Sequence, residues 1–296
     1  MQYSENLLDM NTGEHIGKGY FITDAEYKET QHKKEKQSEG YKYYKNNILP
    51  LPGFLQEEYG EFIQTRYDPL LKEIKYDTAT AFRFIYISTF MNYTNGYLIY
   101  KNNKVNKHTL SEILQVSRNS FTQILNTLLN HKLLMIDSNG YYYINSKYCY
   151  RGAISNNKEY HERYTRIFIN SIRELYSKAS TPREHKLLGR FILILPYINI
   201  YHNIICKNIK EKEIENLLLP NSAELDQILH VSERHSDRTM KELLEITVGG
   251  KPAIMNVSHN KAKMYTVNPS IYYGGTNLSH LKEIDQYFKA EGGLDK

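Results

Sequence analysis

Two segments of this chain carry nearly the same eight-residue pattern, and this repeat constrains the fold more than any other feature. Residues 110–117 read L-S-E-I-L-Q-V-S and residues 225–232 read L-D-Q-I-L-H-V-S, an offset of 225 − 110 = 115. Further on, I-N-S-K-Y-C-Y-R-G at 144–152 corresponds to V-N-P-S-I-Y-Y-G-G at 267–275, an offset of 267 − 144 = 123. Because an ordered series of matches is hard to obtain by chance, we predict an internal duplication. The second copy is 123 − 115 = 8 residues longer, and turn signals place the extra length between residues 249 and 263.

The first copy, residues 109–152, has the pattern of a short helix, a turn, a longer helix and a hairpin. Its apolar residues follow the stripe of an amphipathic helix, i, i+3, i+4, i+7 and i+8: Phe121, Ile124, Leu125, Leu128 and Leu129. Ser117 stands where a helix N-cap belongs, and Asn139-Gly140 is a two-residue hairpin signal. This order of elements predicts a winged helix-turn-helix, which is a DNA-binding module. The offset of 115 carries the stripe onto Met240, Leu243 and Leu244 of the second copy.

We therefore predict a mainly α protein with small β-hairpin wings, an α+β chain of two tandem winged helix-turn-helix domains. The expected parts are a partly flexible N-terminal arm at 1–48, a first domain at 49–153, a linker helix at 154–180, a second domain at 181–275 and a helical tail at 276–296. In the arm, a small hairpin is possible around residues 11–13, and the charged residues 24–37 have no apolar stripe. They form either a solvated tail or a basic arm that lies on phosphates or stacks on a partner.

Outside the repeats, apolar periodicity predicts further helices. Residues 54–74 are expected to be helical with an interruption near Pro69, and residues 79–93 form a strong helix. A third amphipathic helix runs through Ile167, Ile172 and Leu175, and residues 203–206 form a short strand. The amphipathic tail, residues 278–288, is expected to dock either on its own domain or on a second chain.

Base-reading residues are expected on the second helix of each motif, whose N-terminal half enters the major groove. The candidates are Arg118, Asn119, Thr122, Gln123 and Asn126 in the first motif, and Arg234, His235, Arg238 and Lys241 in the second. Arginine suits guanine O6 and N7, whereas asparagine and glutamine suit adenine N6 and N7. The alternative for each side chain is a solvated helix face.

Phosphate contacts are expected from basic loops. The candidates are Lys101, Lys104, Lys107 and His108 before the first motif, and Lys251, His259, Lys261 and Lys263 in the longer second wing. Such contacts fix the position of a protein on DNA without reading its sequence. The alternative is that these lysines only keep two loops soluble.

Composition argues against several other classes. The 38 Lys and Arg residues exceed the 33 Asp and Glu residues by five, so a polyanion would have to be met by local patches. No apolar run approaches the length of a membrane span, and there is no signal-peptide core. The two cysteines, Cys149 and Cys206, have no metal-site spacing and favour a reducing, cytoplasmic setting. We expect no metal, no cofactor and no catalytic residue, since no phosphate loop, zinc-protease motif or paired-histidine nickase motif is present.

The first copy resembles the winged helix of small-plasmid replication proteins of the RepL type. The resemblance rests on L-S-E-I-L-Q-V-S-R-N-S at 110–120 and on a wing that closes in Y-I-N-S-K-Y-C-Y-R-G at 143–152, and it covers about residues 79–153. The two-domain plan is also similar in outline to tandem winged-helix initiators of theta-replicating plasmids and to phage regulators. The resemblance implies a DNA-binding protein of a plasmid or phage.

The leading hypothesis is a sequence-specific binder of double-stranded DNA that regulates transcription or initiates replication. One chain could cover two adjacent half-sites about one helical turn apart, and a homodimer would cover more. The alternative is a winged-helix protein-interaction module without sequence-specific DNA binding. A nicking or joining enzyme with a tyrosine nucleophile ranks last.

Overall fold

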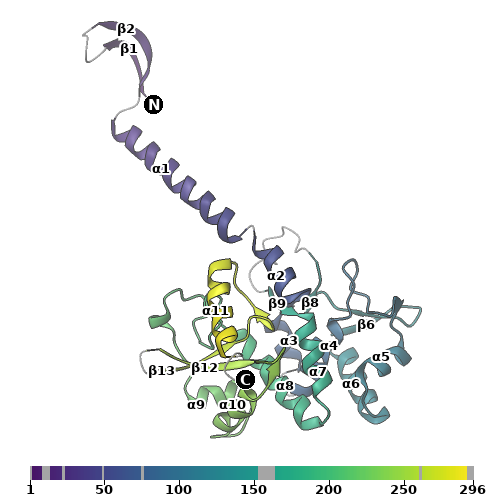
Figure 1. The fold of residues 1–296 in the computed structure, drawn as a ribbon. Helices are drawn as coiled ribbons and strands as arrows, with labels where there is room; N and C mark the ends of the chain where they lie inside the picture. The colour runs from purple at the N-terminus through teal and green to yellow at the C-terminus, as the bar shows by residue number, and fades with distance from the viewer. Residues whose placement is uncertain are drawn as a thin grey trace. The chain divides into compact units, whose positions relative to one another are not determined.

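The computed structural model describes residues 2–8, 14–21, 24–48, 50–74, 77–152, 164–259 and 262–291 (Figure 1). The chain divides into two compact units, Met1–Leu51 and Pro52–Lys296. Among the described residues, helix predominates over strand and the sheets are small and antiparallel. The predicted α+β class is confirmed at this level. No helix in the described part of the chain is both long enough and apolar enough to cross a membrane.

The first unit consists of an antiparallel hairpin and a long helix. Strands β1 (Gln2–Leu8) and β2 (His15–Phe21) pair, and α1 (Asp24–Tyr43) continues into the π-helical turn η1 (Tyr44–Ile48). The turn expected at residues 11–13 lies outside the described residues. The helix α1 was not predicted, because it has no apolar stripe. It is built from good helix formers and carries the i,i+4 ion pair Glu29–Lys33 at 2.7 Å, while nearly all its described side chains are exposed.

The second unit contains two runs of elements that share one order, a strand, two helices, a helix pair, a hairpin and a closing strand, with additional elements in each run. The first run is α2 (Leu51–Tyr59), β3 (Phe62–Arg66), α3 (Tyr67–Ile74), α4 (Thr78–Ser88), β4 (Ile99–Tyr100), β5 (Asn103–Lys104), α5 (Lys107–Leu114), α6 (Arg118–Asn130), β6 (Leu134–Ile136), β7 (Tyr142–Ile144) and β8 (Cys149–Tyr150). The second is β9 (Tyr164–Phe168), α7 (Ile169–Lys178), α8 (Pro182–Ile194), η3 (Leu195–Tyr197), η4 (Ile214–Asn216), α9 (Ser222–Ile228), α10 (Ser236–Leu244), β10 (Thr247–Val248), β11 (Lys251–Pro252), β12 (Ile254–His259), β13 (Ala262–Val267), β14 (Tyr272–Tyr273) and α11 (Leu278–Glu291).

A four-stranded antiparallel sheet, in the order β8-β3-β9-β14, joins the two runs. Its register is symmetric about the central pair Gln64–Arg166, because β3 and β9 are related by an offset of 164 − 62 = 102. Gln64 also pairs with Tyr150, and Arg166 pairs with Tyr273, which are equivalent at the offset of 123. Neither β3 nor β9 was predicted. Both stretches had been assigned to amphipathic helices, and the helices α3 and α7 begin only after the strands end.

The backbone repeats at the offsets read from the sequence. Gln115 and His230, 115 residues apart, follow the first helix of each pair in the left-handed region, at φ 50° and 49°. Asn145 and Asn268, 123 residues apart, make the same hydrogen bonds. Each side-chain amide donates to a carbonyl just before a hairpin strand, Lys132 at 2.8 Å and Pro252 at 2.9 Å, and each Oδ1 accepts an N–H two residues on. The duplication therefore extends to side-chain hydrogen bonds.

The extra eight residues of the second copy divide between two places. Because Lys132 corresponds to Pro252, the offset has risen to 252 − 132 = 120 before the hairpin begins. Five of the residues therefore form the small β10–β11 turn, around Gly249 and Gly250. The remaining three lengthen β12–β13 relative to β6–β7.

Helices α4 and α8 pack against each other at the middle of the unit, and one buried core runs through both halves. Gly189 of α8 lies directly on the backbone of Thr78 at the start of α4. Nearby, the rings of Tyr86 and Tyr176 stack with centroids 3.5 Å apart.

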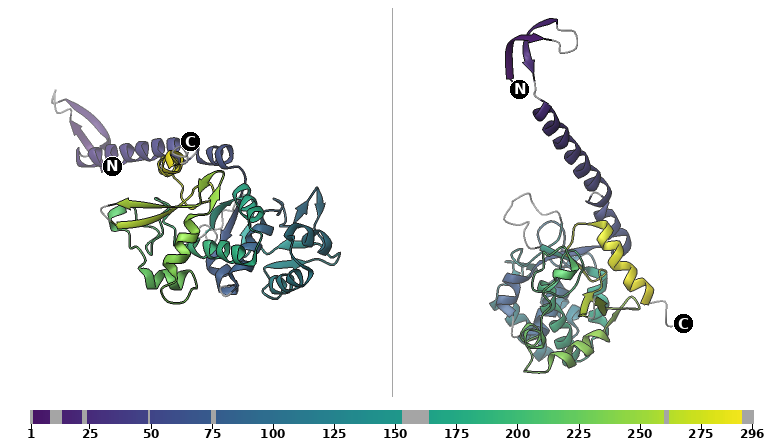
Figure 2. Two further views of the ribbon diagram at one scale, coloured as in Figure 1. Left: turned by 60° about the horizontal axis from the view of Figure 1, so that its bottom comes forward. Right: turned by 90° about the vertical axis from the view of Figure 1, so that its left-hand side faces the viewer.

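The C-terminal helix α11 docks on its own unit, which is one of the two arrangements considered for the tail. Its apolar residues Leu278, Leu281, Ile284 and Phe288 are buried. Lys289 at its end forms an ion pair with Glu58 of α2 at 3.6 Å, and the two helices lie side by side in Figure 2.

Candidate nucleic-acid interface

The first helix pair, α5 and α6, is joined by a three-residue turn. The left-handed Gln115 ends α5, and the Ser117 hydroxyl accepts the N–H of Ser120 at 3.3 Å, so the predicted N-cap is confirmed. Phe121, Ile124, Leu125 and Leu128 are buried, as the stripe predicted. One face of α6 is thereby held in the core, and the opposite face is left to solvent.

That free face of α6 consists of polar side chains. Arg118, Asn119, Thr122, Gln123 and Asn126 are all exposed. The Thr122 hydroxyl donates to the carbonyl of Arg118 at 3.0 Å, whereas the other four side chains make no hydrogen bond with a described residue. Four exposed side chains with uncommitted donors and acceptors can pair with an external ligand at no cost in internal bonds.

The lysines before and at the start of α5 are exposed, but they differ in whether an aromatic ring holds the ammonium group. Lys104 lies over the ring of Tyr97, 4.0 Å from its centroid, and Lys101 lies 5.2 Å from that of Tyr100. Lys104 also lies 5.6 Å from the ring centroid of Tyr141, so its ammonium group is held beside the first hairpin, β6–β7, whereas Lys101 is held beside β4. Lys107, at the first position of α5, has no such contact, and His108 lies 3.4 Å from Glu112 on the same helix.

The second helix pair, α9 and α10, begins its second helix later than predicted. Helix α10 starts at Ser236, so Arg234 and His235 lie in the preceding turn and not on the helix. The cause is Asp226, whose carboxylate accepts the N–H groups of Arg234 at 2.8 Å and of Ser236 at 2.7 Å. Burial raises the pKa of Asp226, but these donors outweigh it and lower that pKa below its usual range. Arg234 is in the left-handed region, at φ 66°.

A basic hollow of about 280 Å³ opens between this turn, α10 and α8. Glu242 accepts from Arg238 at 3.1 Å and from Arg183 at 2.7 Å, which places two guanidinium groups around one carboxylate. Arg190 lines the same hollow and pairs with no described residue. Three guanidinium groups against one carboxylate leave a net positive charge, which suits an oxyanion. Lys241 is exposed on the same helix.

Sequence reasoning missed Arg183 and Arg190, because they lie 225 − 183 = 42 and 225 − 190 = 35 residues before the second motif, which begins at Leu225. A signal was present: the two arginines are seven residues apart and so share one face of α8.

The second hairpin, β12–β13, is only partly described. Lys263 is exposed, and its pKa is raised, first by a hydrogen bond to Tyr265. Lys251 is half-buried beside the β10–β11 turn. Lys261 and the side chain of His259 lie outside the described residues.

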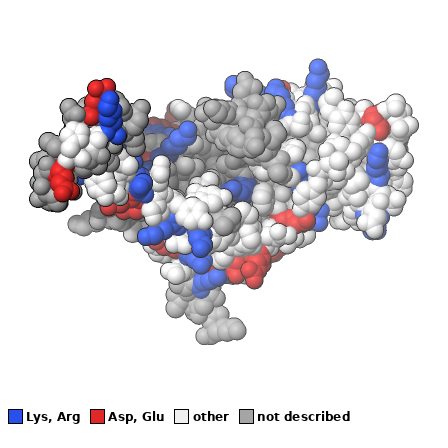
Figure 3. All heavy atoms as spheres, turned by 90° about the horizontal axis from the view of Figure 1, so that it is seen from above, with Lys and Arg blue, Asp and Glu red and all other residues white. Residues whose placement is uncertain are grey.

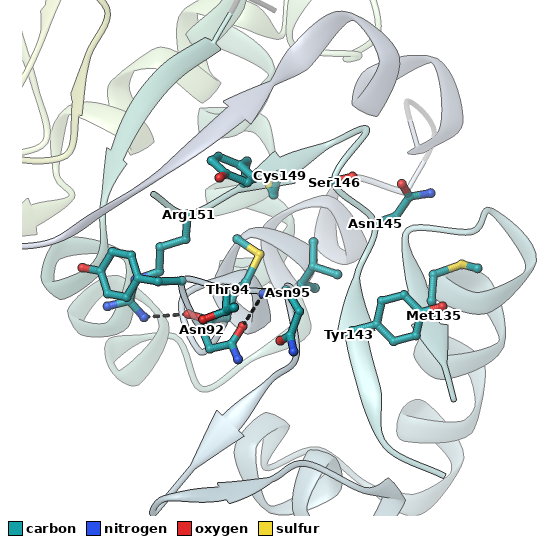
Figure 4. Close-up of a pocket in the computed structure, with 14 residues that line it drawn as sticks. Asn92, Thr94, Asn95, Met135, Tyr143, Asn145, Ser146, Cys149 and Arg151 are labelled. Carbon is teal, nitrogen blue, oxygen red and sulfur yellow. Dashed lines mark hydrogen bonds between the residues drawn. The ribbon is translucent and has the colours of Figure 1, made fainter. Parts of the chain in front are cut away.

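A second hollow, of about 410 Å³, lies between the first hairpin and the loop 91–96 (Figure 4). Its amides already have partners: Asn92 accepts the N–H of Asn95 at 3.2 Å, and Asn145 is bonded as above. Arg151 donates to the carbonyl of Met91 and to Glu61. The side chains of Asn92, Asn145 and Arg151 therefore connect parts of the fold, and none of the three is free to bind a ligand.

Neither the charge distribution nor the metal-binding and thiol chemistry of the described residues indicates a further functional site. On the face drawn in Figure 3, Lys and Arg atoms are interspersed with Asp and Glu atoms. No group of three or more potential metal ligands occurs in the ranges that the structure describes. Cys149 and Cys206 are buried, and burial raises the pKa of each thiol to about 11, which makes both poor nucleophiles.

Comparison with known proteins provides no further guide: no protein-family model, curated protein or solved structure matches this chain.

Proposed function

We propose that this chain is a sequence-specific double-stranded DNA-binding protein whose two halves are winged helix-turn-helix units. The observation that carries the proposal is the exposed face of α6, with its four uncommitted hydrogen-bonding side chains. The helix follows a tight turn and precedes a hairpin, which is the setting in which such a helix enters the major groove.

In this account α6 reads bases. Arg118 at the start of the helix is suited to guanine, and Gln123 and Asn126 are suited to adenine. Each bidentate pair is worth about 1–3 kcal/mol of discrimination against the wrong base. Asn119 and Thr122 complete the face and contact the neighbouring edge or backbone.

The second half of the Pro52–Lys296 unit mainly contacts the DNA backbone. Its basic hollow holds Arg183, Arg190 and Arg238 around a space of about 280 Å³. In the first half of the same unit, the exposed lysines Lys101 and Lys107 supply further phosphate contacts. Contacts of this kind position the protein and make its affinity depend on salt.

The biological role proposed is regulation of transcription or initiation of replication on a plasmid or phage, in the cytoplasm. This part rests on the resemblance of residues 79–153 to RepL-type replication proteins. A footprint on the DNA that flanks the gene would separate the two roles, because a regulator covers a promoter and an initiator covers an origin.

The direct test replaces the reading face. A chain with Arg118, Gln123 and Asn126 changed to alanine should lose at least about tenfold in affinity for a selected duplex. The reason is the loss of side-chain hydrogen bonds to base edges, which are worth about 1–3 kcal/mol for each bidentate contact. Its affinity for random duplex should change much less. The matched control changes Glu283 and Gln286, which are exposed on α11, to alanine and should leave binding intact.

A protein-interaction module is the competing function. Protein interfaces are anchored mainly by Trp, Tyr and Arg side chains, and of these the exposed face of α6 has only Arg118. If the triple variant binds the selected duplex as tightly as the unaltered chain, α6 is not the reader and the proposal fails.

A further inference from the structure

The central sheet places the two halves of the second unit around a local two-fold axis. Equivalent strands pair at its centre, with Phe62 opposite Phe168 and Arg66 opposite Tyr164. The outer strands repeat the relation, since Thr65 pairs with Cys149 and Ile167 pairs with Tyr272. Antiparallel pairing of equivalent segments in symmetric register is the hydrogen-bond pattern of a two-fold interface.

The same relation holds beyond the sheet. Helix α6 packs on α4 and helix α10 packs on α8, while α4 and α8 pack on each other. In Figure 1, α9, α10 and the second hairpin lie on one side of this central pair, and α5, α6 and the first hairpin lie on the other. Both α6 and α10 lie away from the sheet, at the lower edge of that view.

We infer that one chain reads a single duplex containing two half-sites that run in opposite directions, centred on this local axis. The inference rests on the proposed function and names the class of DNA element. A two-fold axis reverses the direction of whatever it relates, and B-DNA has two-fold axes of its own perpendicular to the helix. The symmetry of a DNA-binding protein is therefore mirrored in its site.

The two half-sites are contacted in different ways, because the two second helices differ in chemistry. Helix α6 presents Asn119, Gln123 and Asn126, whereas α10 presents Arg238 and Lys241. The element is thus inverted in geometry without being a palindrome in sequence, and it gives the bound chain one fixed orientation on the DNA.

The experiment maps equivalent points of both halves onto the duplex. Four full-length proteins each carry one added cysteine: Ser138→Cys and Ser258→Cys in the two hairpins, and Glu112→Cys and Gln227→Cys on α5 and α9. All four positions are exposed, and the last two are equivalent at the offset of 115. An iron chelate coupled to the thiol cuts the selected duplex nearby. The unaltered chain treated with the same reagent is the control, because its two thiols are buried.

A mirrored order of cuts along the duplex is expected, with one chain bound per duplex. The order is either hairpin, helix, helix, hairpin or helix, hairpin, hairpin, helix. A repeated order of hairpin, helix, hairpin, helix would overturn the inversion while leaving sequence-specific binding in place. Two duplexes bound by one chain would overturn it as well, since the two faces would then point apart. A chain with no preference for any selected duplex would overturn the proposed function itself.

Discussion

The two halves of the second unit share one backbone arrangement but have different exposed side chains. In both, a left-handed residue ends the first helix, an asparagine closes the hairpin, and a short strand returns to the central sheet. The second helices differ: α6 begins directly after its N-cap Ser117, whereas α10 begins at Ser236, three residues later than the offset of 115 requires, since 118 + 115 = 233. Ser111 of the first half is replaced by Asp226, whose carboxylate captures the turn.

The difference shows that buried packing and surface chemistry vary independently in this fold. Buried positions of α10 keep the register of α6, because Met240 and Leu243 are buried where Leu125 and Leu128 are. The solvent faces do not: that of α6 carries uncommitted amides, whereas that of α10 carries Arg238, which shares Glu242 with Arg183 of α8. A duplicated module can thus change what it contacts without changing how it is held.

The largest effect is expected where α4 packs on α8. The two helices begin at Thr78 and Pro182, an offset of 182 − 78 = 104, and this offset relates Ile85 of α4 to Gly189 of α8. A Cβ on Gly189 would lie 1.9 Å from the carbonyl oxygen of Thr78, which is backbone and cannot rotate away. Gly189→Ala should lower the free energy of unfolding by about 3 kcal/mol or more, or prevent folding. Gly53→Ala, with nothing within 4 Å, is the control and should be neutral or slightly stabilising in urea denaturation. Equal stability of both variants would contradict the helix packing.

The two hairpin asparagines should differ in proportion to burial. Asn268 is 1% exposed, and its Oδ1 also accepts from the Ser270 hydroxyl at 2.7 Å, whereas Asn145 is half-buried. We expect Asn268→Ala to cost about 2–3 kcal/mol and Asn145→Ala about 1 kcal/mol, because buried groups left without partners cost most. Urea denaturation of both variants measures the difference. If Asn145→Ala costs more, the two hairpins are not held alike.

Acid should weaken the second half selectively through His185, whose equivalent in the first half is the buried Ala81. Burial, and then the nearby Arg83, lowers the pKa of His185 to about 4. The unfolded chain therefore takes up this proton first, so stability is lost as the pH falls from about 6.5 to about 4, and the group has no effect above that window. After allowance for partial solvation the loss is about 1–2 kcal/mol. His185→Gln should flatten the decline of unfolding free energy across this window, and an unchanged slope would show that His185 is not its source.

The smallest effect concerns the DNA phosphate contacts that we propose for the second half. Arg190→Gln should weaken binding to selected and random duplexes equally, by at most about 1 kcal/mol. It should also lower the slope of log affinity against log salt by about 0.9, the loss of one phosphate contact. Lys282→Gln on α11, a single-charge change at an exposed position, is the control. A sequence-dependent loss in the Arg190 variant would mean that the second half reads bases too.

Regular periodicity made the helices of the repeat predictable, and the Asn139-Gly140 turn located the β6–β7 hairpin, whereas the strands β3 and β9 of the central sheet were not predicted. The stripe from Phe121 to Leu128 and the Ser117 cap are local features, so sequence alone located α6. The strands β3 and β9 are five residues each and run directly into helices, so their alternation was absorbed into a helical pattern. Their pairing partner is another part of the chain, which no local pattern contains.

The functional residues divide in the same way. The face of α6 follows from helical spacing, and the structure places all five expected side chains on it. The start of α10 depends on Asp226, ten residues earlier, and the basic hollow depends on Arg183 and Arg190 of another helix. Long-range hydrogen bonds and packing decide these, so sequence placed Arg234 and His235 on a helix that they precede.

The central claim is that α6 distinguishes one DNA sequence from others, and an affinity ratio tests it most directly. After selection from a random duplex pool, the affinity of the full chain for the winning duplex is compared with that for a shuffled duplex of the same composition, at physiological salt. The account predicts a ratio of about 1,000 or more, as is typical of specific binders. Equal affinities for the two duplexes would contradict it.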